Sequence, residues 1–301
     1  MPDVCVLNKC NNKCIMCTNP DPFVRSEIEG NYDLKTQIKK LNMYLKGIKI
    51  YEGNKEFDNY ITLTGGEPTL HKDFFKIVYY FRINLPNIPI TLLTNARKFK
   101  DEKFTIKFAK IAKQPFSVAI NFPSSKKNIF EKITQIKGSF SETIKGSYNL
   151  LKYFKGTIEF RIVLIRQNYK YLKETMIYLL KKFKKYDNWR ATIIHYEIEG
   201  KSLENHKKIS VKLTESSKEI KKIKKLILSY EHEVRLYHYP LCIVDKELRK
   251  YCWITLPLDE RIYTKKCNKC FYKKNCLGLM LEYYKIYGDY ELKPTIKPKY
   301  T

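Results

Sequence analysis

Three cysteines stand close together near the N-terminus, in the segment KCNNKCIMCTN at residues 9–19: Cys10, Cys14 and Cys17. Thiolates ligate zinc and iron–sulfur clusters, and a closed structural site of either kind uses four ligands. The next cysteine after Cys17 is Cys242, so no local fourth ligand completes the set. The spacing predicts either a metal centre with one position left for a ligand from solution, or a zinc site closed by a distant His or Cys.

Further candidate residues stand at the ends of predicted strands. Six short runs rich in β-branched residues predict these strands, at 4–7, 60–64, 90–93, 117–122, 158–165 and 191–196. The cysteine segment follows the first run. The candidates on or after the other five are Gly65, Gly66, Glu67, Pro68, Thr94, Asn95, Asn121, Arg161 and Glu197. The carboxyl ends of the strands form the active face of α/β barrels, so these side chains are expected to converge.

Helical periodicity fills the intervals between the strands. The segment 31–47 places leucine and isoleucine at every third or fourth residue, which is typical of an amphipathic helix. Other helices are predicted near 72–83, 101–112, 141–154, 169–184 and 213–230. Strands that alternate with helices imply a parallel sheet. The sequence therefore predicts an α/β fold, a partial (β/α)6 TIM-type barrel over residues 1–232.

Five of the nine cysteines lie after this region, in a Tyr- and Lys-rich stretch without clear periodicity. Residues 233–301 are therefore expected to form a small C-terminal domain. The run CNKCFYKKNC supplies Cys267, Cys270 and Cys276, and a C-x2-C-x5-C spacing predicts metal–thiolate ligation. A structural zinc site and an iron–sulfur cluster both fit this spacing. Cys242 is the expected fourth ligand, with Cys252 as the rival.

Composition and charge set outer limits on function. The 301 residues are 44% hydrophobic, which suits a globular domain, and no apolar run is long enough to span a membrane. The start lacks the pattern of a signal peptide, so a cytoplasmic protein with metal-binding or catalytic cysteines is expected. The net charge of +27 fits RNA binding. It also fits an AT-rich codon bias with solvated lysines, which we favour because the basic residues are spread along the helices.

Cys10-x3-Cys14-x2-Cys17, followed by the GlyGlyGluPro segment at 65–68, resembles the radical S-adenosylmethionine (SAM) superfamily. The resemblance implies that the three cysteines hold three irons of a [4Fe–4S] cluster. The amino and carboxylate groups of SAM chelate the fourth iron, and reductive cleavage of SAM yields a 5′-deoxyadenosyl radical. This reading reduces a zinc site or a simple ferredoxin-like carrier to a minor alternative.

The resemblance also assigns roles around SAM. Gly65 and Gly66 would let the backbone approach the methionine moiety, and Glu67 would accept from its ammonium group. Thr94 and Asn95 would lie near the ribose and methionine, and Arg161 would pair with the carboxylate. The cofactor-binding set is completed by Pro68, Asn121, Glu197 and Met16, which stands where the family usually has an aromatic residue beside the adenine.

Over nearly the whole chain, the segments around these residues resemble radical SAM maturases of His-Xaa-Ser peptide systems. The C-terminal cysteines resemble the SPASM or twitch extensions of such enzymes, which implies one auxiliary [4Fe–4S] cluster, with zinc as the alternative. A ribosomally made peptide or protein substrate and a ferredoxin or reductase electron donor would follow. The alternatives are a radical SAM enzyme acting on tRNA, rRNA or a small cofactor precursor, and a non-catalytic zinc- or cluster-binding protein.

Overall fold

The computed structural model describes residues 3–19, 32–47 and 60–296. Eight strands form one parallel sheet, arranged in the order in which they occur along the chain. They are β1 (Asp3–Leu7), β2 (Ile61–Gly65), β3 (Ile90–Thr94), β4 (Phe116–Asn121), β5 (Thr157–Leu164), β6 (Trp189–His195), β7 (Val234–Tyr237) and β8 (Cys252–Trp253). In the described part of the chain, β1 pairs with β2 alone and β8 with β7 alone, so the curved sheet is open between its first and last strands.

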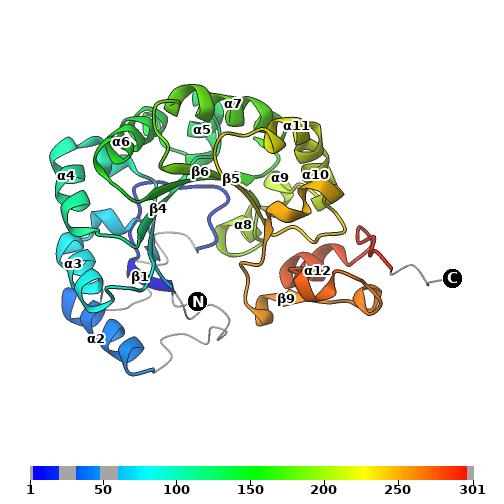
Figure 1. Cartoon of the computed structure of the whole chain (residues 1–301), viewed down its shortest axis with the longest axis horizontal. Coiled ribbons are helices and arrows are strands. Elements are labelled where there is room, and N and C mark those ends of the chain that lie inside the picture. Colours follow the sequence, from blue (N-terminus) through cyan, green and yellow to red (C-terminus); the bar gives the residue numbers. More distant parts are fainter. Residues whose placement is uncertain (1–2, 20–31, 48–59, 297–301) are drawn as a thin grey trace.

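Helices surround the outer, convex side of the sheet (Figure 1). The α-helices that the structure describes are α2 (Leu34–Leu45), α3 (Phe74–Asn84), α4 (Glu102–Ile111), α5 (Lys127–Thr134), α6 (Ser139–Tyr153), α7 (Leu172–Phe183), α8 (Gly200–Glu204), α9 (His206–Ile209), α10 (Leu213–Lys222), α11 (Lys224–Leu228) and α12 (Leu281–Tyr287). Within these described residues, no helix combines the length and apolar character needed to cross a membrane.

The predicted α/β class and the parallel sheet are confirmed, but the sheet has eight strands where the sequence predicted six. The two extra strands, β7 and β8, extend the sheet past the predicted boundary at 232/233, as far as Trp253. They escaped notice because β7 has four residues and β8 two, too few for an alternation pattern to stand out.

The two faces of the sheet differ in character. On the outer face, Phe160 of β5 stacks on Phe183 of α7 with ring centroids 4.9 Å apart, and Phe116 of β4 meets Phe108 of α4. The inner face carries polar side chains, including Glu159. Parallel sheets are usually apolar on both faces, so a polar inner face indicates that it serves something other than packing.

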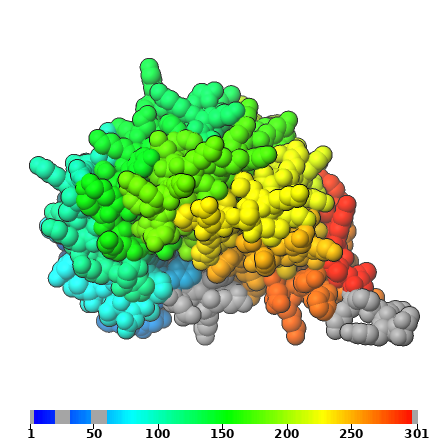
Figure 2. Space-filling model, turned by 45° about the horizontal axis from the view of Figure 1, so that its top comes forward, coloured from blue at the N-terminus to red at the C-terminus, as the bar shows by residue number. Residues whose placement is uncertain are grey.

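Past β8, the chain forms a small cysteine-rich module. It contains the two-stranded sheet of β9 (Arg261–Ile262) and β10 (Leu279–Met280), followed by α12. The backbone N–H of Leu213, at the start of α10, donates to Tyr283 of α12 over 3.0 Å. In Figure 2 the orange and red residues of this module lie against the yellow helical residues and partly project from the body. The module is thus attached to the last helices of the barrel.

Candidate functional site

The segment after β1, which we call the cysteine loop (residues 8–19), brings the three N-terminal cysteines together. Burial raises the pKa of the Cys14 thiol, and the neighbouring Cys17 and Cys10 raise it further. The backbone N–H of Asn12 points at Cys10 Sγ over 3.4 Å, and Asn121 Nδ2 points at Cys14 Sγ over 3.8 Å. Three neighbouring, half-buried thiols, approached by N–H donors, fit the three-iron side of a [4Fe–4S] cluster, whose iron would offset their charge.

Gly65, the last residue of β2, and the following Gly66 hold the start of the cysteine loop in place from one side. Gly66 N–H donates to Leu7 O over 2.6 Å, and a Cβ at Gly66 would lie 2.3 Å from Asn8 O and 2.4 Å from Lys9 O. Gly65 has φ +125°, and a Cβ there would lie 2.4 Å from Leu7 O. Glycine is therefore required here by the close approach to Leu7, Asn8 and Lys9, and the sequence-based role of these glycines toward SAM stays a prediction.

Glu67 is buried, and four protein donors surround its carboxylate. Oε1 accepts from the Thr69 N–H (3.2 Å), the Thr69 hydroxyl (2.6 Å) and the Thr94 hydroxyl (2.7 Å), and Oε2 accepts from the Asn95 N–H (2.7 Å). Burial raises the pKa of Glu67, and these hydrogen bonds act in the opposite direction. The carboxylate thus joins the β2 and β3 loops, and its sequence-based role of accepting from the SAM ammonium group stays a prediction.

A network after β3, which sequence reasoning missed, holds the cysteine loop from the other side. Asn95 Nδ2 donates to Asn11 Oδ1 over 2.6 Å. Arg97 donates to the carbonyl of Asn11 and to Asn12 Oδ1 (2.9 Å), and Arg97 in turn pairs with Glu142 of α6 over 2.6 Å. The proximity of Arg97 to the predicted Asn95 was the only sequence signal, because its partners in the cysteine loop lie more than 80 positions away and Glu142 lies 45 positions away.

The other predicted residues lie in the cysteine loop or on the strands and strand ends beside it. Met16 is buried in the core, and Pro68 is the first residue of a short 3-10 helix that Glu67 caps. Asn121 and Arg161 are direct neighbours in the register of β4 and β5. Their roles toward SAM stay predictions.

Three arginines line the inner face beyond Asn121. Arg161 and Arg190 both bind the buried carboxylate of Glu159, over 2.6 and 2.7 Å, and Arg235 binds Glu233 over 2.6 Å. Burial alone would raise the pKa of Glu159, but Arg161 and Arg190 lower it to about 2. Among the described residues of this face, Arg161, Arg190 and Arg235 are thus held in place by ion pairs with the carboxylates of Glu159 and Glu233.

Four of the five C-terminal cysteines lie around one pocket. Cys242, Cys267, Cys270 and Cys276 all line one small pocket of the C-terminal module. Burial raises the pKa of Cys242 to about 11, with a further contribution from the other three thiols. Cys252 is not among the lining residues, which favours Cys242 over Cys252 as the fourth ligand. Within the described ranges, no group of three or more His, Cys, Asp or Glu side chains has the spacing needed to hold a metal ion as it stands.

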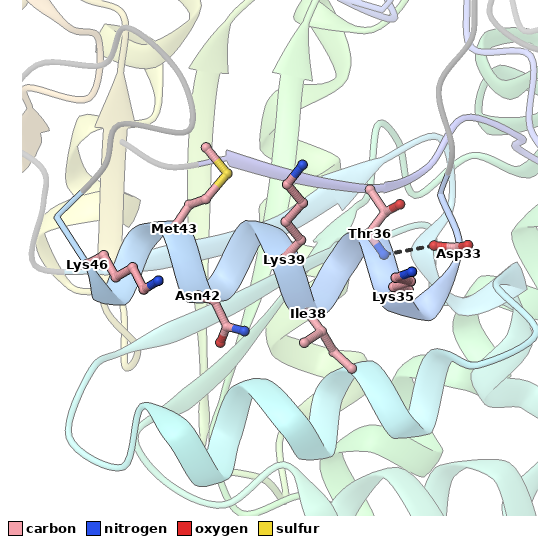
Figure 3. Close-up of a pocket in the computed structure, with 8 residues that line it drawn as sticks. All are labelled: Asp33, Lys35, Thr36, Ile38, Lys39, Asn42, Met43 and Lys46. Atoms are coloured by element: carbon pink, nitrogen blue, oxygen red, sulfur yellow. Dashed lines mark hydrogen bonds between the residues drawn. The ribbon is translucent and has the colours of Figure 1, made fainter.

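A larger hollow runs along α2 (Figure 3). All of its lining residues come from this one helix and its caps, between Asp33 and Lys46, and none is a predicted site residue. Asp33 accepts a hydrogen bond from the Thr36 N–H over 2.7 Å, as an ordinary helix cap. This hollow is therefore not part of the candidate site.

Comparisons with known proteins bear on this site. The radical SAM superfamily model matches residues 4–179. Among curated proteins, GTP 3′,8-cyclase from Campylobacter lari is 27% identical over 143 residues, which cover 48% of this chain and 40% of that protein. GTP 3′,8-cyclase from Clostridium botulinum is 29% identical over 133 residues, covering 44% of this chain and 37% of that protein. The chain thus matches about two fifths of the length of these relatives.

Two solved structures are similar at low identity. TYW1 with a lysine–pyruvate adduct aligns with a TM-score of 0.46 at 18% identity, covering 73% of this chain and 70% of that one. A radical SAM methyltransferase from Sphaerobacter thermophilus aligns with a TM-score of 0.42 at 12% identity, covering 62% and 52%. Neither curated relative is named as a peptide maturase, so the predicted peptide-maturase subgroup gains no support from them. The family match, over more than half of the chain, establishes that the protein is an enzyme of the radical SAM superfamily.

Proposed function

We propose that the protein binds a [4Fe–4S] cluster through Cys10, Cys14 and Cys17, cleaves SAM there, and acts on a substrate that contains a nucleotide. When bound, the cluster and SAM supply one-electron chemistry that generates a 5′-deoxyadenosyl radical. The chain's part is to hold the cysteine loop rigidly, through Gly66, Glu67 and the Asn95–Arg97 network, and to exclude water from Cys14. A low-potential electron donor, such as a ferredoxin or a reductase, is required.

The observation that carries the nucleotide assignment is the charge of the inner face. Arg161 and Arg235 flank Thr192 in the register of β5, β6 and β7, and Asn121, which contacts Cys14, is the next neighbour of Arg161. The arginine row (Arg161, Arg190 and Arg235) thus starts one strand, or about 5 Å, from Asn121, which contacts the cysteine loop. Guanidinium groups bind phosphate oxygens in a bidentate manner, so this row suits a phosphorylated substrate.

An exposed aromatic residue completes the argument. Trp253 of β8 is 45% exposed, and the guanidinium of Arg235 lies over its ring at 3.9 Å. A tryptophan face beside arginines suits a flat, charged ligand, because a base can stack on the ring while its phosphates meet the cations. The names of the curated relatives point the same way, since both are GTP 3′,8-cyclases.

RNA is the second candidate, supported by the surface of the C-terminal module. Residues 261–280 contain six lysines and arginines and no acidic residue, and Phe271 between them is 55% exposed. Exposed lysines around an aromatic ring fit a single-stranded nucleic acid. The same module is proposed to hold a second [4Fe–4S] cluster on Cys242, Cys267, Cys270 and Cys276, with zinc as the alternative.

The test is anaerobic reconstitution with iron and sulfide, followed by quantification of 5′-deoxyadenosine after addition of SAM and dithionite. Cys14→Ala should abolish the product. GTP, other nucleotides, single-stranded RNA and a peptide library are then compared for stimulation of 5′-deoxyadenosine formation. Stimulation by nucleotides alone supports the proposal, a strongly salt-dependent stimulation by RNA favours the second candidate, and stimulation by peptides alone refutes both.

The role of the arginine row is tested separately. Arg235→Met and Trp253→Ala should raise the KM for the stimulating nucleotide, and Lys181→Met, which removes an exposed positive charge from the outer helix α7, should not. For the second site, metal analysis decides between iron and zinc. Cys270→Ala should remove one cluster's worth of iron and sulfide, or an equivalent of zinc, and leave the first site loaded.

A further inference from the structure

A glutamate and a histidine face each other at the carboxyl ends of β6 and β7. Glu197, which follows β6, has its Oε1 3.1 Å from Nε2 of His238, which follows β7. The His238 side chain is 7% exposed and that of Glu197 is 30% exposed. The sequence suggested Glu197 as a cofactor-binding residue and gave His238 no role. The pair lies on the edge of the sheet where active sites of α/β barrels form.

The hydrogen bonds of His238 fix where its protons are. Nδ1 lies 2.9 Å from the backbone carbonyl of His195, and a carbonyl oxygen can only accept. Nδ1 therefore carries a proton. The other nitrogen, Nε2, faces a carboxylate oxygen, and two acceptors cannot share a contact of 3.1 Å without a proton between them. One further proton thus lies between Nε2 and the carboxyl group of Glu197.

Two further titratable groups lie near the pair. Glu199 is on the same loop, and its pKa is raised by burial and by the charges of Glu197 and of Glu282 on α12. His195, on β6, is fully buried, and burial lowers its pKa to about 3, with a smaller contribution from His238, so it is neutral.

The backbone of His238 is also unusual. Its φ of +68° is in the left-handed region, which a residue other than glycine seldom occupies. Such conformations persist where the surrounding structure holds them in place, often at functional sites. Here the strained backbone aims the imidazole between the carbonyl of His195 and Glu197.

The pair connects the two cysteine sites. Ser202, five residues after Glu197, donates its N–H to the carbonyl of Cys17 over 3.0 Å, and its hydroxyl donates to the carbonyl of Glu197. On the other side, His238 precedes Cys242 by four residues. A substrate held between the two sites would meet the exposed carboxyl group of Glu197.

We propose that Glu197 and His238 share one proton and act as an acid–base pair on a substrate bound between the two cysteine sites. Glu197 is the catalytic residue, because its carboxyl group is accessible, and His238 is a positioning residue that stores the proton. The step moves one proton from the pair to a basic oxygen or nitrogen of the substrate, breaking and forming only X–H bonds. It changes no oxidation state, and water returns the proton through the exposed side of Glu197. The inference rests on the proposed function.

The first test is independent of SAM cleavage. Nitrogen-15 NMR of histidine-labelled, reconstituted protein in its oxidised state reports the protons on each ring nitrogen, and His238→Asn assigns the resonance. Asparagine tolerates a left-handed backbone, so this variant should fold. We expect Nε2 of His238 to show the nitrogen-15 shift of a nitrogen that shares a proton with a carboxyl group. In Glu197→Gln this shift should change to that of a neutral imidazole with its proton on Nδ1, while the matched Glu199→Gln should leave it unchanged. A wild-type Nε2 resonance identical to that in Glu197→Gln overturns the shared proton.

The second test measures turnover with the stimulating nucleotide. Glu197→Gln should lower the amount of product formed per 5′-deoxyadenosine about 100-fold, the usual contribution of a positioned acid–base group. His238→Asn should shift the pH profile of product formation without changing KM. A Glu197→Gln enzyme with the wild-type rate and pH profile refutes the acid–base role. Absence of 5′-deoxyadenosine from the wild type would instead refute the proposed function, and the NMR result would still stand.

Discussion

Replacement of Gly66 by alanine is predicted to displace the cysteine loop without unfolding the protein. The added Cβ would lie 2.3 Å from Asn8 O and 2.4 Å from Lys9 O, whereas real Cβ atoms keep at least 3.0 Å from such atoms. Both obstacles are backbone, so the loop must retreat by at least about 0.7 Å. A displacement of about 1 Å at a catalytic site costs about 100-fold in rate. We therefore expect a 10- to 100-fold loss of 5′-deoxyadenosine formation.

The assay compares Gly66→Ala with a matched glycine variant elsewhere. Gly138 has φ +85°, and a Cβ there would meet nothing within 4 Å, so Gly138→Ala introduces backbone strain without a clash. Iron and sulfide are quantified after reconstitution, 5′-deoxyadenosine formation is timed, and urea unfolding reports stability. Gly138→Ala should lose about 1 kcal/mol of stability and keep its cluster. Full cluster loading and a wild-type rate in Gly66→Ala would refute the clamp.

Three further predictions concern the ion pairs and the second site. Because Arg161 and Arg190 lower the pKa of Glu159 from 4.5 to about 2, its ionised form should contribute about 3 kcal/mol above pH 4.5, a contribution lost as the pH falls toward 2. Urea unfolding across this range should show the loss, and a Glu159→Gln variant with the same acid dependence would contradict the assignment. Cys242→Ser should deplete metal at the C-terminal site while Cys252→Ser should not, as checked by metal analysis; equal effects would reopen the choice of ligand. Arg97→Lys removes the forked contacts to the cysteine loop and should speed loss of iron to a chelator, and an unchanged rate would argue against the clamp.

The sequence was informative wherever chemistry depended on local spacing. The three N-terminal cysteines, the glycines after β2 and the C-x2-C-x5-C run were found from sequence, since each set is contained within a few residues. Strands β1 to β6 were found for a similar reason, because each is a clear apolar run between helices. The two short strands β7 and β8 carry too little pattern to be detected, and their pairing is fixed by the rest of the sheet.

Partners distant in sequence could not be predicted. The sequence predicted that Glu67 follows the second strand. Its four donors, however, come from positions up to 28 residues away, and only the fold shows that they surround the carboxylate. The role of His238 depends on Glu197 and the carbonyl of His195, both more than 40 residues earlier. A histidine without a ligand pattern gives no signal in a sequence, whereas the fold shows which two groups its ring nitrogens contact.

The hydrogen bonds of the cysteine loop have a consequence for how the enzyme recovers from damage. Backbone and side-chain contacts from α5, the β2 and β3 loops and α8 to α9 together hold residues 9–19, as in the bonds from Lys13 N to Thr134 O and from Asn205 Nδ2 to Ile15 O. None of these bonds involves the cluster. A loop that is ordered by the fold loses little conformational entropy when the cluster is inserted. Oxygen-damaged protein stripped of iron should therefore stay folded and accept a new cluster directly, without refolding.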